Sequence, residues 1–264
     1  MSAPPPPLRR ADADGVSTLA LADVGTRNSL SEAMLAALQA ELAALADDDA
    51  IRAVVLSADG PVFSSGHNLR EMQAHRNDPD RGRGYVDALF ARCAAVMTTI
   101  VRLPKPVIAA VEGLATAAGC QLVATCDLAV AGAEARFQTP GVNKGLFCST
   151  PAVAVSRAVA PKHAMQMLLL GEPIDAETAF RFGLVYEVVP AGRALAAAQA
   201  LGARIAGKRA CAMRHGKPAF YAQRELPLDE AYAAARAVMV ENFLEPDVAE
   251  GTAALLEKRA PRWT

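Results

Sequence analysis

A run of very small residues between a strand and a helix is the first segment that could do chemistry. Residues 106–112 predict a buried strand that breaks at Gly113, and an apolar helical run follows at 121–125. Between them, Ala117, Ala118 and Gly119 leave the unpaired N–H groups of a helix start open to another molecule. Such groups can hold a negative or polarised oxygen, although small residues also suit tight packing of a strand against a helix.

A second segment of the same form comes earlier in the chain. A strand is predicted at residues 51–57, and Val62-Phe-Ser-Ser-Gly-His-Asn-Leu69 then breaks at a glycine before a helix-like run. One backbone N–H group from each segment could converge on a single thioester carbonyl oxygen.

With these two segments the chain resembles the enoyl-CoA hydratase/isomerase (crotonase) superfamily. The resemblance covers residues 16–259 and is carried by FSSGHNL, by GLATAAGCQ and by Cys126-Asp127. The runs GLATAAGCQL and TPGVNKGLFCSTP most resemble the branch of enoyl-CoA hydratase domain-containing protein 3. The resemblance implies an α/β fold with a crotonase-like ββα spiral core and a helical C-terminal trimerisation region. Such trimers are commonly paired into hexamers.

The resemblance also implies an oxyanion hole formed by the backbone N–H groups of His67 and Ala118. These donors would polarise the thioester carbonyl, and one such donor typically lowers the barrier by about 2.7–4 kcal/mol. Because the backbone supplies both donors, the His67 imidazole need not be catalytic. It could line the acyl pocket, titrate, or merely neighbour the hole.

Hydration of a conjugated double bond needs two proton-handling groups as well. Family hydratases use two glutamates, and their positions correspond here to Gln121 and Gly141. An amide does not titrate near neutral pH and glycine has no side chain, so neither supplies general acid–base catalysis. The family label would be enoyl-CoA hydratase, a lyase of fatty-acid metabolism, but we expect hydratase activity to be weak or absent.

Other chemistries stay open at this point. Dienoyl-CoA isomerases and chlorobenzoyl-CoA dehalogenases of the family carry an aspartate where this chain has Ser149, but serine needs a base to act as a nucleophile. Naphthoate synthases share glycine at the Gly141 position and use bicarbonate, so space beside Gly141 could take a small anion or water. The alternatives to a hydratase are thus an isomerase or thioesterase and a non-catalytic acyl-CoA binder, in which Gln121 orients a ligand or lines the pocket.

Coenzyme A is expected as part of the thioester substrate, with no separate cofactor and no metal. Arg27, Arg70 and Lys258 match positions where relatives place basic residues near the coenzyme, and Leu255 matches an aromatic residue beside it. Cations of this kind suit phosphates through charge and hydrogen bonding. The resemblance implies that Lys258 often acts from a neighbouring subunit.

The elements that must position these residues alternate between strands and helices up to about residue 190 and are helical afterwards. One helix should carry Leu35, Leu38, Leu42 and Leu45, with Ser29 and Glu32 as a capping box at its start. The other expected strands cover residues 16–21, 127–131, 135–138 and 184–189, and the other expected helices cover 85–103, 162–170, 176–182, 193–207, 211–224, 229–244 and 246–259.

We therefore expect one continuous structural domain with three parts. Residues 1–14 are predicted to be a disordered Pro-rich tail, 15–190 the spiral core and 191–264 the helical C-terminal region. A chain of 264 residues can bury roughly 70–75% of its unfolded surface in one core.

Composition narrows the range of partners. The 27 basic and 28 acidic residues nearly balance, which gives no electrostatic case for nucleic acid or an anionic membrane. No apolar run reaches the roughly 18 residues of a membrane span. The five cysteines lack CxxC spacing and predict reduced thiols. Because Asp12 and Asp14 also argue against a transit peptide, we expect a cytoplasmic protein.

Overall fold

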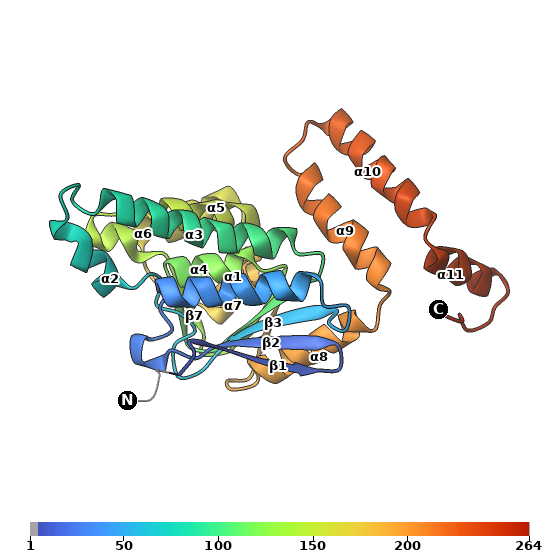
Figure 1. Cartoon of the computed structure of the whole chain (residues 1–264), viewed down its shortest axis with the longest axis horizontal. Helices are drawn as coiled ribbons and strands as arrows, with labels where there is room; N and C mark the ends of the chain where they lie inside the picture. The colour runs from blue at the N-terminus through green and yellow to red at the C-terminus, as the bar shows by residue number, and fades with distance from the viewer. Residues whose placement is uncertain (1–4, 264) are drawn as a thin grey trace.

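A six-stranded sheet forms the centre of the molecule (Figure 1). The computed structural model describes residues 5–263. The sheet has the order β1-β2-β3-β4-β6-β9, in which only the β1–β2 pair is antiparallel. Its strands are β1 (Leu8–Ala13), β2 (Val16–Leu21), β3 (Ala53–Ala58), β4 (Val107–Val111), β6 (Leu128–Gly132) and β9 (Glu187–Val189). A smaller sheet is formed by β5 (Leu114–Thr116), β7 (Arg136–Gln138) and β8 (Ile174–Asp175).

Helices cover both faces of the large sheet. The main core lies on one face, against α1, α3 and α4, and a second apolar cluster lies between the other face and α8 (Figure 1). The helices are α1 (Glu32–Ala46), α2 (Leu69–Ala74), α3 (Arg83–Arg102), α4 (Ala118–Thr125), α5 (Ser149–Ala158), α6 (Pro161–Leu170), α7 (Ala176–Phe182), α8 (Ala194–Ala206), α9 (Ala210–Gln223), α10 (Leu228–Phe243) and α11 (Pro246–Leu256). Short 3-10 turns occur at η1 (Val24–Thr26), η2 (His75–Asn77) and η3 (Pro140–Lys144).

The predicted disordered tail is wrong for residues 8–13, which form the edge strand β1. Residues 1–4 of that prediction lie outside the described residues. The strand exists because Asp14 and Gly15 form a two-residue hairpin turn, with φ of 51° and 73°. Positive φ at both positions matches the twist of the flanking strands, so Asp-Gly is a strong hairpin signal. The proline run that precedes the strand obscured this signal.

Helix α1 begins two residues later than the predicted capping box. Ser31 is the N-cap, and its side chain accepts the Met34 N–H at 3.2 Å. Ser29 instead donates its hydroxyl to Thr26 within the preceding turn. The leucines at positions 35, 38, 42 and 45 are all buried, as the periodicity predicts, and the helix ends before Asp47.

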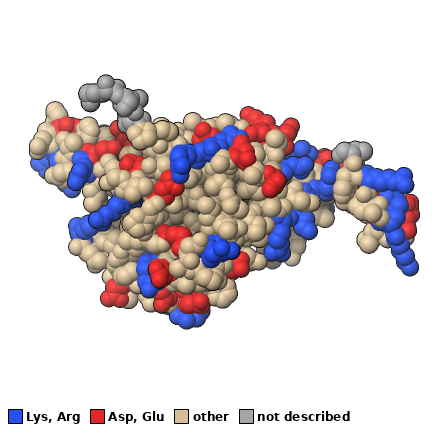
Figure 2. All heavy atoms as spheres, turned by 90° about the horizontal axis from the view of Figure 1, so that it is seen from below, with Lys and Arg blue, Asp and Glu red and all other residues tan. Residues whose placement is uncertain are grey.

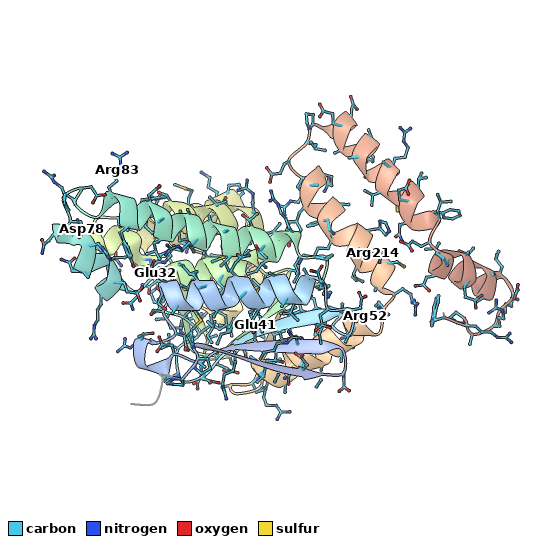
Figure 3. The ribbon with its side chains drawn as sticks, in the orientation of Figure 1. Glu32, Glu41, Arg52, Asp78, Arg83 and Arg214 are labelled. Carbon is cyan, nitrogen blue, oxygen red and sulfur yellow. The ribbon has the colours of Figure 1, made fainter. Side chains whose placement is uncertain are left out.

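Helix α3 is long and apolar enough to cross a membrane by length and composition, with a mean hydropathy of 1.3. Core residues of the fold account for this composition, because Leu89, Val96 and Ile100 are buried in the main cluster. The turn before the helix lies at one end of the molecule and is marked by Asp78 and Arg83 in Figure 3.

Helices α9 to α11 leave the core as an arm (Figure 1). The predicted C-terminal region also contained α8, but α8 packs on the sheet, so the protruding part starts at α9. Lys217 anchors α9, since its ammonium group is nearly buried, pairs with Asp127 at 2.7 Å and donates to two backbone carbonyls. Further out, Arg214 pairs with Glu245 at 2.7 Å (Figure 3).

Charged side chains of both signs are spread over the face seen from below, around a broad uncharged area (Figure 2). Lys and Arg are most frequent along the arm in this view, with smaller groups over the rest of the face. This distribution agrees with the balanced composition and presents no continuous basic surface on this face.

Candidate functional site

The two predicted segments lie against each other at the carboxyl ends of the central strands. Ser64 accepts the Thr116 N–H at 3.0 Å, and its own N–H donates to Leu114 at 3.2 Å. Their contact needs glycine, because a Cβ at Gly119 would lie 2.5 Å from the Ser64 carbonyl oxygen. The Ser64 hydroxyl is buried and donates to Asn28, which ties the same segment to the loop after β2.

The amides of His67 and Ala118 are neighbours and are not used by the fold. Ala118 is the first residue of α4, where N–H groups have no partner within the helix. In the part of the chain that the structure describes, neither amide has a hydrogen-bond acceptor. A Cβ built on Gly66, directly before His67, would lie 3.1 Å from the Ala118 nitrogen. Two unpaired donors at such close range can hold one oxygen atom.

The His67 side chain is largely enclosed. Its Nδ1 lies 3.4 Å from the Leu30 carbonyl oxygen, and its ring centroid lies 5.3 Å from that of Phe90 on α3. Its Nε2 is buried without a hydrogen-bond partner. Burial lowers the pKa of His67 below its ordinary value, against a smaller opposing effect of the Leu30 carbonyl. The imidazole is therefore neutral at pH 7.

Gln121 lies one turn after Ala118 and is only 4% exposed. Its Oε1 is buried without a partner, while its backbone carbonyl accepts the Thr125 hydroxyl at 2.7 Å. The residue also lines a cavity of about 1100 Å³ between α3, α4, α5 and α9. Its amide therefore has an unsatisfied acceptor that a ligand or a water molecule could pair.

The space expected beside Gly141 is filled. A Cβ at this position would lie 2.2 Å from the Leu146 carbonyl oxygen and 2.8 Å from the Cys148 sulfur. The Gly141 N–H also donates to that sulfur at 3.2 Å. No anion or water fits in the direction a side chain would take, so the structure gives no support to the alternative of a bound anion at that point. The spacing alone could not reveal that the loop folds back on itself.

Ser149 and Cys148 lack the surroundings of an activated nucleophile. Ser149 is exposed, and its hydroxyl donates only to the Phe147 carbonyl, at 3.4 Å. Burial raises the pKa of the Cys148 thiol, so it is protonated at neutral pH. The residues that the structure describes place no base against either side chain. They also contain no group of three or more His, Cys, Asp or Glu residues that could hold a metal ion.

Two of the three basic residues that were predicted to bind coenzyme A lie near the unpaired amides. The carbonyl of Arg27 accepts the Ser65 N–H at 3.0 Å, and Arg70 is in the first turn of α2, just after His67. Both side chains are exposed. Lys258 lies beyond α11, at the far end of the arm, and α2 lies at the opposite end of the molecule (Figure 1). One chain therefore brings Arg27 and Arg70, but not Lys258, to the amides.

Sequence reasoning named Gly66 and Ala117 without predicting their backbone conformations, and it missed Phe90. Gly66 has a φ of 82°, and Ala117 has a φ of 52° although it is not glycine. The Ala117 N–H donates to Gln138 at 2.9 Å, which holds the strained turn in place. Phe90 packs on His67 from a distant helix. Only Gly66 had a local signal, because glycine is the residue that most easily adopts a positive φ.

Comparisons with known proteins identify relatives of this chain. The profile of the family described as enoyl-CoA hydratase/isomerase matches residues 12–264. The chain is 44% identical to human enoyl-CoA hydratase domain-containing protein 3, mitochondrial, over 98% of this chain and 84% of that protein. It is 33% identical to the 2,3-dehydroadipyl-CoA hydratase of Escherichia coli, with 93% and 94% covered.

Solved structures extend the comparison to the fold. A crystal structure of an enoyl-CoA hydratase from Mycobacterium smegmatis has a TM-score of 0.92 at 49% identity and covers 98% of this chain and 99% of that one. The structure of human enoyl-CoA hydratase domain-containing protein 3 has a TM-score of 0.90 at 44% identity, with 97% and 100% covered. The predicted crotonase fold and the predicted branch are thereby confirmed.

The predicted cytoplasmic location is wrong by the same comparison. The relatives from rat, frog, mouse, human and zebrafish, which are 43–46% identical, are all named mitochondrial. The acidic residues that argued against targeting serve the fold instead. Asp12 is part of strand β1 and pairs with Arg10 at 2.7 Å. Reduced thiols, in turn, do not distinguish one reducing compartment from another.

Proposed function

The chain belongs to the enoyl-CoA hydratase/isomerase family, and from this we propose that it binds acyl-CoA thioesters with the carbonyl oxygen between the amides of His67 and Ala118. The observation that carries the proposal is the pair of unpaired, adjacent N–H groups on two interlocked segments. A fold normally pairs its buried backbone donors. Two adjacent backbone N–H donors without acceptors are best explained by a ligand oxygen that accepts hydrogen bonds from both.

Ordinary hydration is not the reaction we propose for this site. Hydration needs one group to activate water and another to protonate the α carbon, each typically worth about 10²–10⁴-fold in rate. The positions of the two family glutamates are taken by Gln121 and Gly141, and neither can carry out proton transfer. The hole is most useful when negative charge develops on the thioester oxygen, so chemistry through an enolate, such as isomerisation, is the second candidate.

The coenzyme would be held mainly by its phosphates. Arg27 and Arg70 are exposed beside the hole and free of ion pairs among the described residues, which suits them to phosphate oxygens. We propose that Lys258 reaches the coenzyme from a neighbouring copy, in a homotrimer or a hexamer of paired trimers. Support comes from the arm, where α10 has only Ala231 buried while Leu228, Tyr232, Met239 and Phe243 are exposed. Apolar stripes of this kind are normally covered.

Calorimetry and a hydration assay test the proposal together. We expect wild-type protein to bind butyryl-CoA and to hydrate crotonyl-CoA hardly above the uncatalysed rate. Arg27→Ala/Arg70→Ala should weaken binding about tenfold or more, because each change removes charged hydrogen bonds to phosphate. Arg204→Ala, a matched change of an exposed arginine on α8, should leave affinity unchanged.

Three results separate the alternatives. No affinity for acyl-CoA at sub-millimolar ligand would contradict the proposal as a whole. Rapid hydration by the wild type would refute the inference drawn from Gln121 and Gly141. Release of free coenzyme A thiol would identify a thioesterase.

A further inference from the structure

We propose that the His67 side chain is the base of this site, with Nε2 removing a proton from the α carbon of an acyl-CoA whose carbonyl oxygen the two amides hold. The inference rests on the proposed acyl-CoA function and adds a catalytic group to it. One residue would then supply both an oxyanion donor, through its backbone, and the proton acceptor, through its side chain.

Position favours this assignment. The amide of His67 is one of the two donors, and covalent geometry keeps Nε2 within one side-chain length of that amide. The α carbon of the substrate is bonded directly to the carbonyl carbon. A base on this residue therefore lies near the proton that must be removed, which is the first requirement for general base catalysis.

The tautomer also favours it. The contact of Nδ1 with the Leu30 carbonyl, at 3.4 Å, can form only if Nδ1 carries the hydrogen. Nε2 is then left with its lone pair, and it is buried without a partner. Phe90 packs against the ring and restricts its rotation. A buried acceptor without a donor suggests that a ligand atom completes it.

The surroundings keep the imidazole ready to accept a proton. Burial lowers the pKa of His67, and no charged side chain contributes to the shift. The nearby carboxylates are engaged elsewhere, since Glu71 of α2 accepts from Asn68 and from the Glu32 N–H, and Glu32 of α1 pairs with Arg92 of α3. The side chain is therefore neutral at pH 7.

Other side chains near the hole cannot take this role. The Gln121 amide does not titrate. The Cys148 thiol is protonated, and its sulfur accepts the Gly141 N–H. Ser149 is exposed and has no base among the described residues. Burial raises the pKa of the Cys120 thiol to about 12, so this thiol is protonated as well. His67 is then the titratable group that remains on the two interlocked segments.

The proposed step is balanced without a co-reactant. The Cα–H bond breaks, its electron pair forms the carbon–carbon double bond of an enolate, and the negative charge rests on the thioester oxygen between the amides. The proton moves to Nε2 and gives an imidazolium ion. Return of a proton to the same carbon exchanges the α hydrogen with solvent. When the acyl chain carries a β,γ double bond, return to the γ carbon moves that bond into conjugation.

Deuterium exchange tests the step directly. Butyryl-CoA incubated with wild-type protein in D₂O should gain one and then two mass units by mass spectrometry. His67→Gln, which keeps the backbone donor but has no base, should slow this exchange about 100-fold while affinity for butyryl-CoA stays within a few-fold. His163→Gln is the matched control, because His163 on α6 also packs against a phenyl ring, with its centroid 3.8 Å from that of Phe182, and also has a buried unpartnered nitrogen. This control should exchange at the wild-type rate.

Two results would overturn the inference while leaving acyl-CoA binding intact: no exchange above buffer by a wild type that binds butyryl-CoA, or wild-type exchange by His67→Gln. Failure of the wild type to bind would instead overturn the proposed function. If the variant does not fold, the wild-type pH profile decides. The exchange rate should be highest at neutral pH and fall in acid as His67 becomes protonated, at a pH below the ordinary histidine pKa because burial lowers the pKa of His67. A rate that stays constant down to the pH at which the protein unfolds would contradict a histidine base.

Discussion

The amides of His67 and Ala118 are unpaired for two different local reasons. Ala118 opens a helix, so its N–H has no partner in the preceding turn. Ala117, directly before it, has a backbone conformation with φ of 52° and ψ of −120°. A non-glycine residue in such a conformation costs about 1–3 kcal/mol, and strain of this size is often found at functional sites. His67 follows Gly66, whose positive φ lets the chain pass close to Ala118.

Residue-level reasoning located the two unpaired amides, which depend on the local backbone, and failed where packing decides. The amides could be predicted because glycine and alanine at a strand-to-helix junction expose N–H groups whatever surrounds them. The space beside Gly141 could not be predicted, since it depends on how a loop returns seven residues later. The contact of Phe90 with the His67 ring depends on tertiary packing, and no residue near His67 in the sequence indicates it.

Alanine substitutions test the packing around Gly141. Gly141→Ala should destabilise the protein by about 1–3 kcal/mol, because the new methyl group meets the backbone of Leu146 and something must shift. Gly216→Ala on α9 is the control, since nothing lies within 4 Å of its added methyl group. Helix propensity predicts that this change stabilises by about 0.5–1 kcal/mol. Thermal unfolding measures both, and equal effects of the two changes would contradict the crowding at Gly141.

At the scale of elements, hydrophobic periodicity was a reliable guide to the helices, although the cap of α1 lies two residues after the predicted one. Helix α7 begins after Asp175, whose carboxylate accepts the Thr178 N–H at 2.8 Å, and ends at Gly183 as predicted. Strand β2 has its predicted bounds. The errors fell on short elements with few residues to show a pattern, such as β5 and β8, and on β1, where the proline run outweighed the hairpin signal.

The exposed apolar stripe of α10, on the arm, is the surface that we expect to contact another copy of the chain. A double change, Tyr232→Glu/Met239→Glu, places two charges on the exposed stripe of α10 and should prevent assembly, because charges at an apolar interface would be buried unpaired. Light scattering should give the wild type a mass of three or six times 27.6 kDa and the variant a mass near one. Leu195→Glu on α8, away from the arm, should stay assembled. A monomeric wild type would contradict the assembly.

Over the whole molecule, α2 and the end of the arm at α11 lie at opposite ends (Figure 1). Arg70 belongs to α2 and Lys258 follows α11, so a single chain does not bring these two cations to one coenzyme. The cavity beside Gln121 opens between the core and α9, and its shape therefore depends on how the arm is held. Assembly and ligand binding are coupled in this account, and Lys217 is the residue that fixes the base of the arm to the core.

The central claim is that two main-chain amides hold a thioester oxygen, and infrared spectroscopy of a bound thioester measures this directly. With a ¹³C label at the carbonyl of butyryl-CoA, the carbonyl stretch should move below its frequency in water on binding to the wild type. Ala118→Pro removes one donor at a helix position that accepts proline, and it should abolish most of that shift. A bound carbonyl that absorbs at its frequency in water, or that shifts equally in Ala118→Pro, would contradict the account.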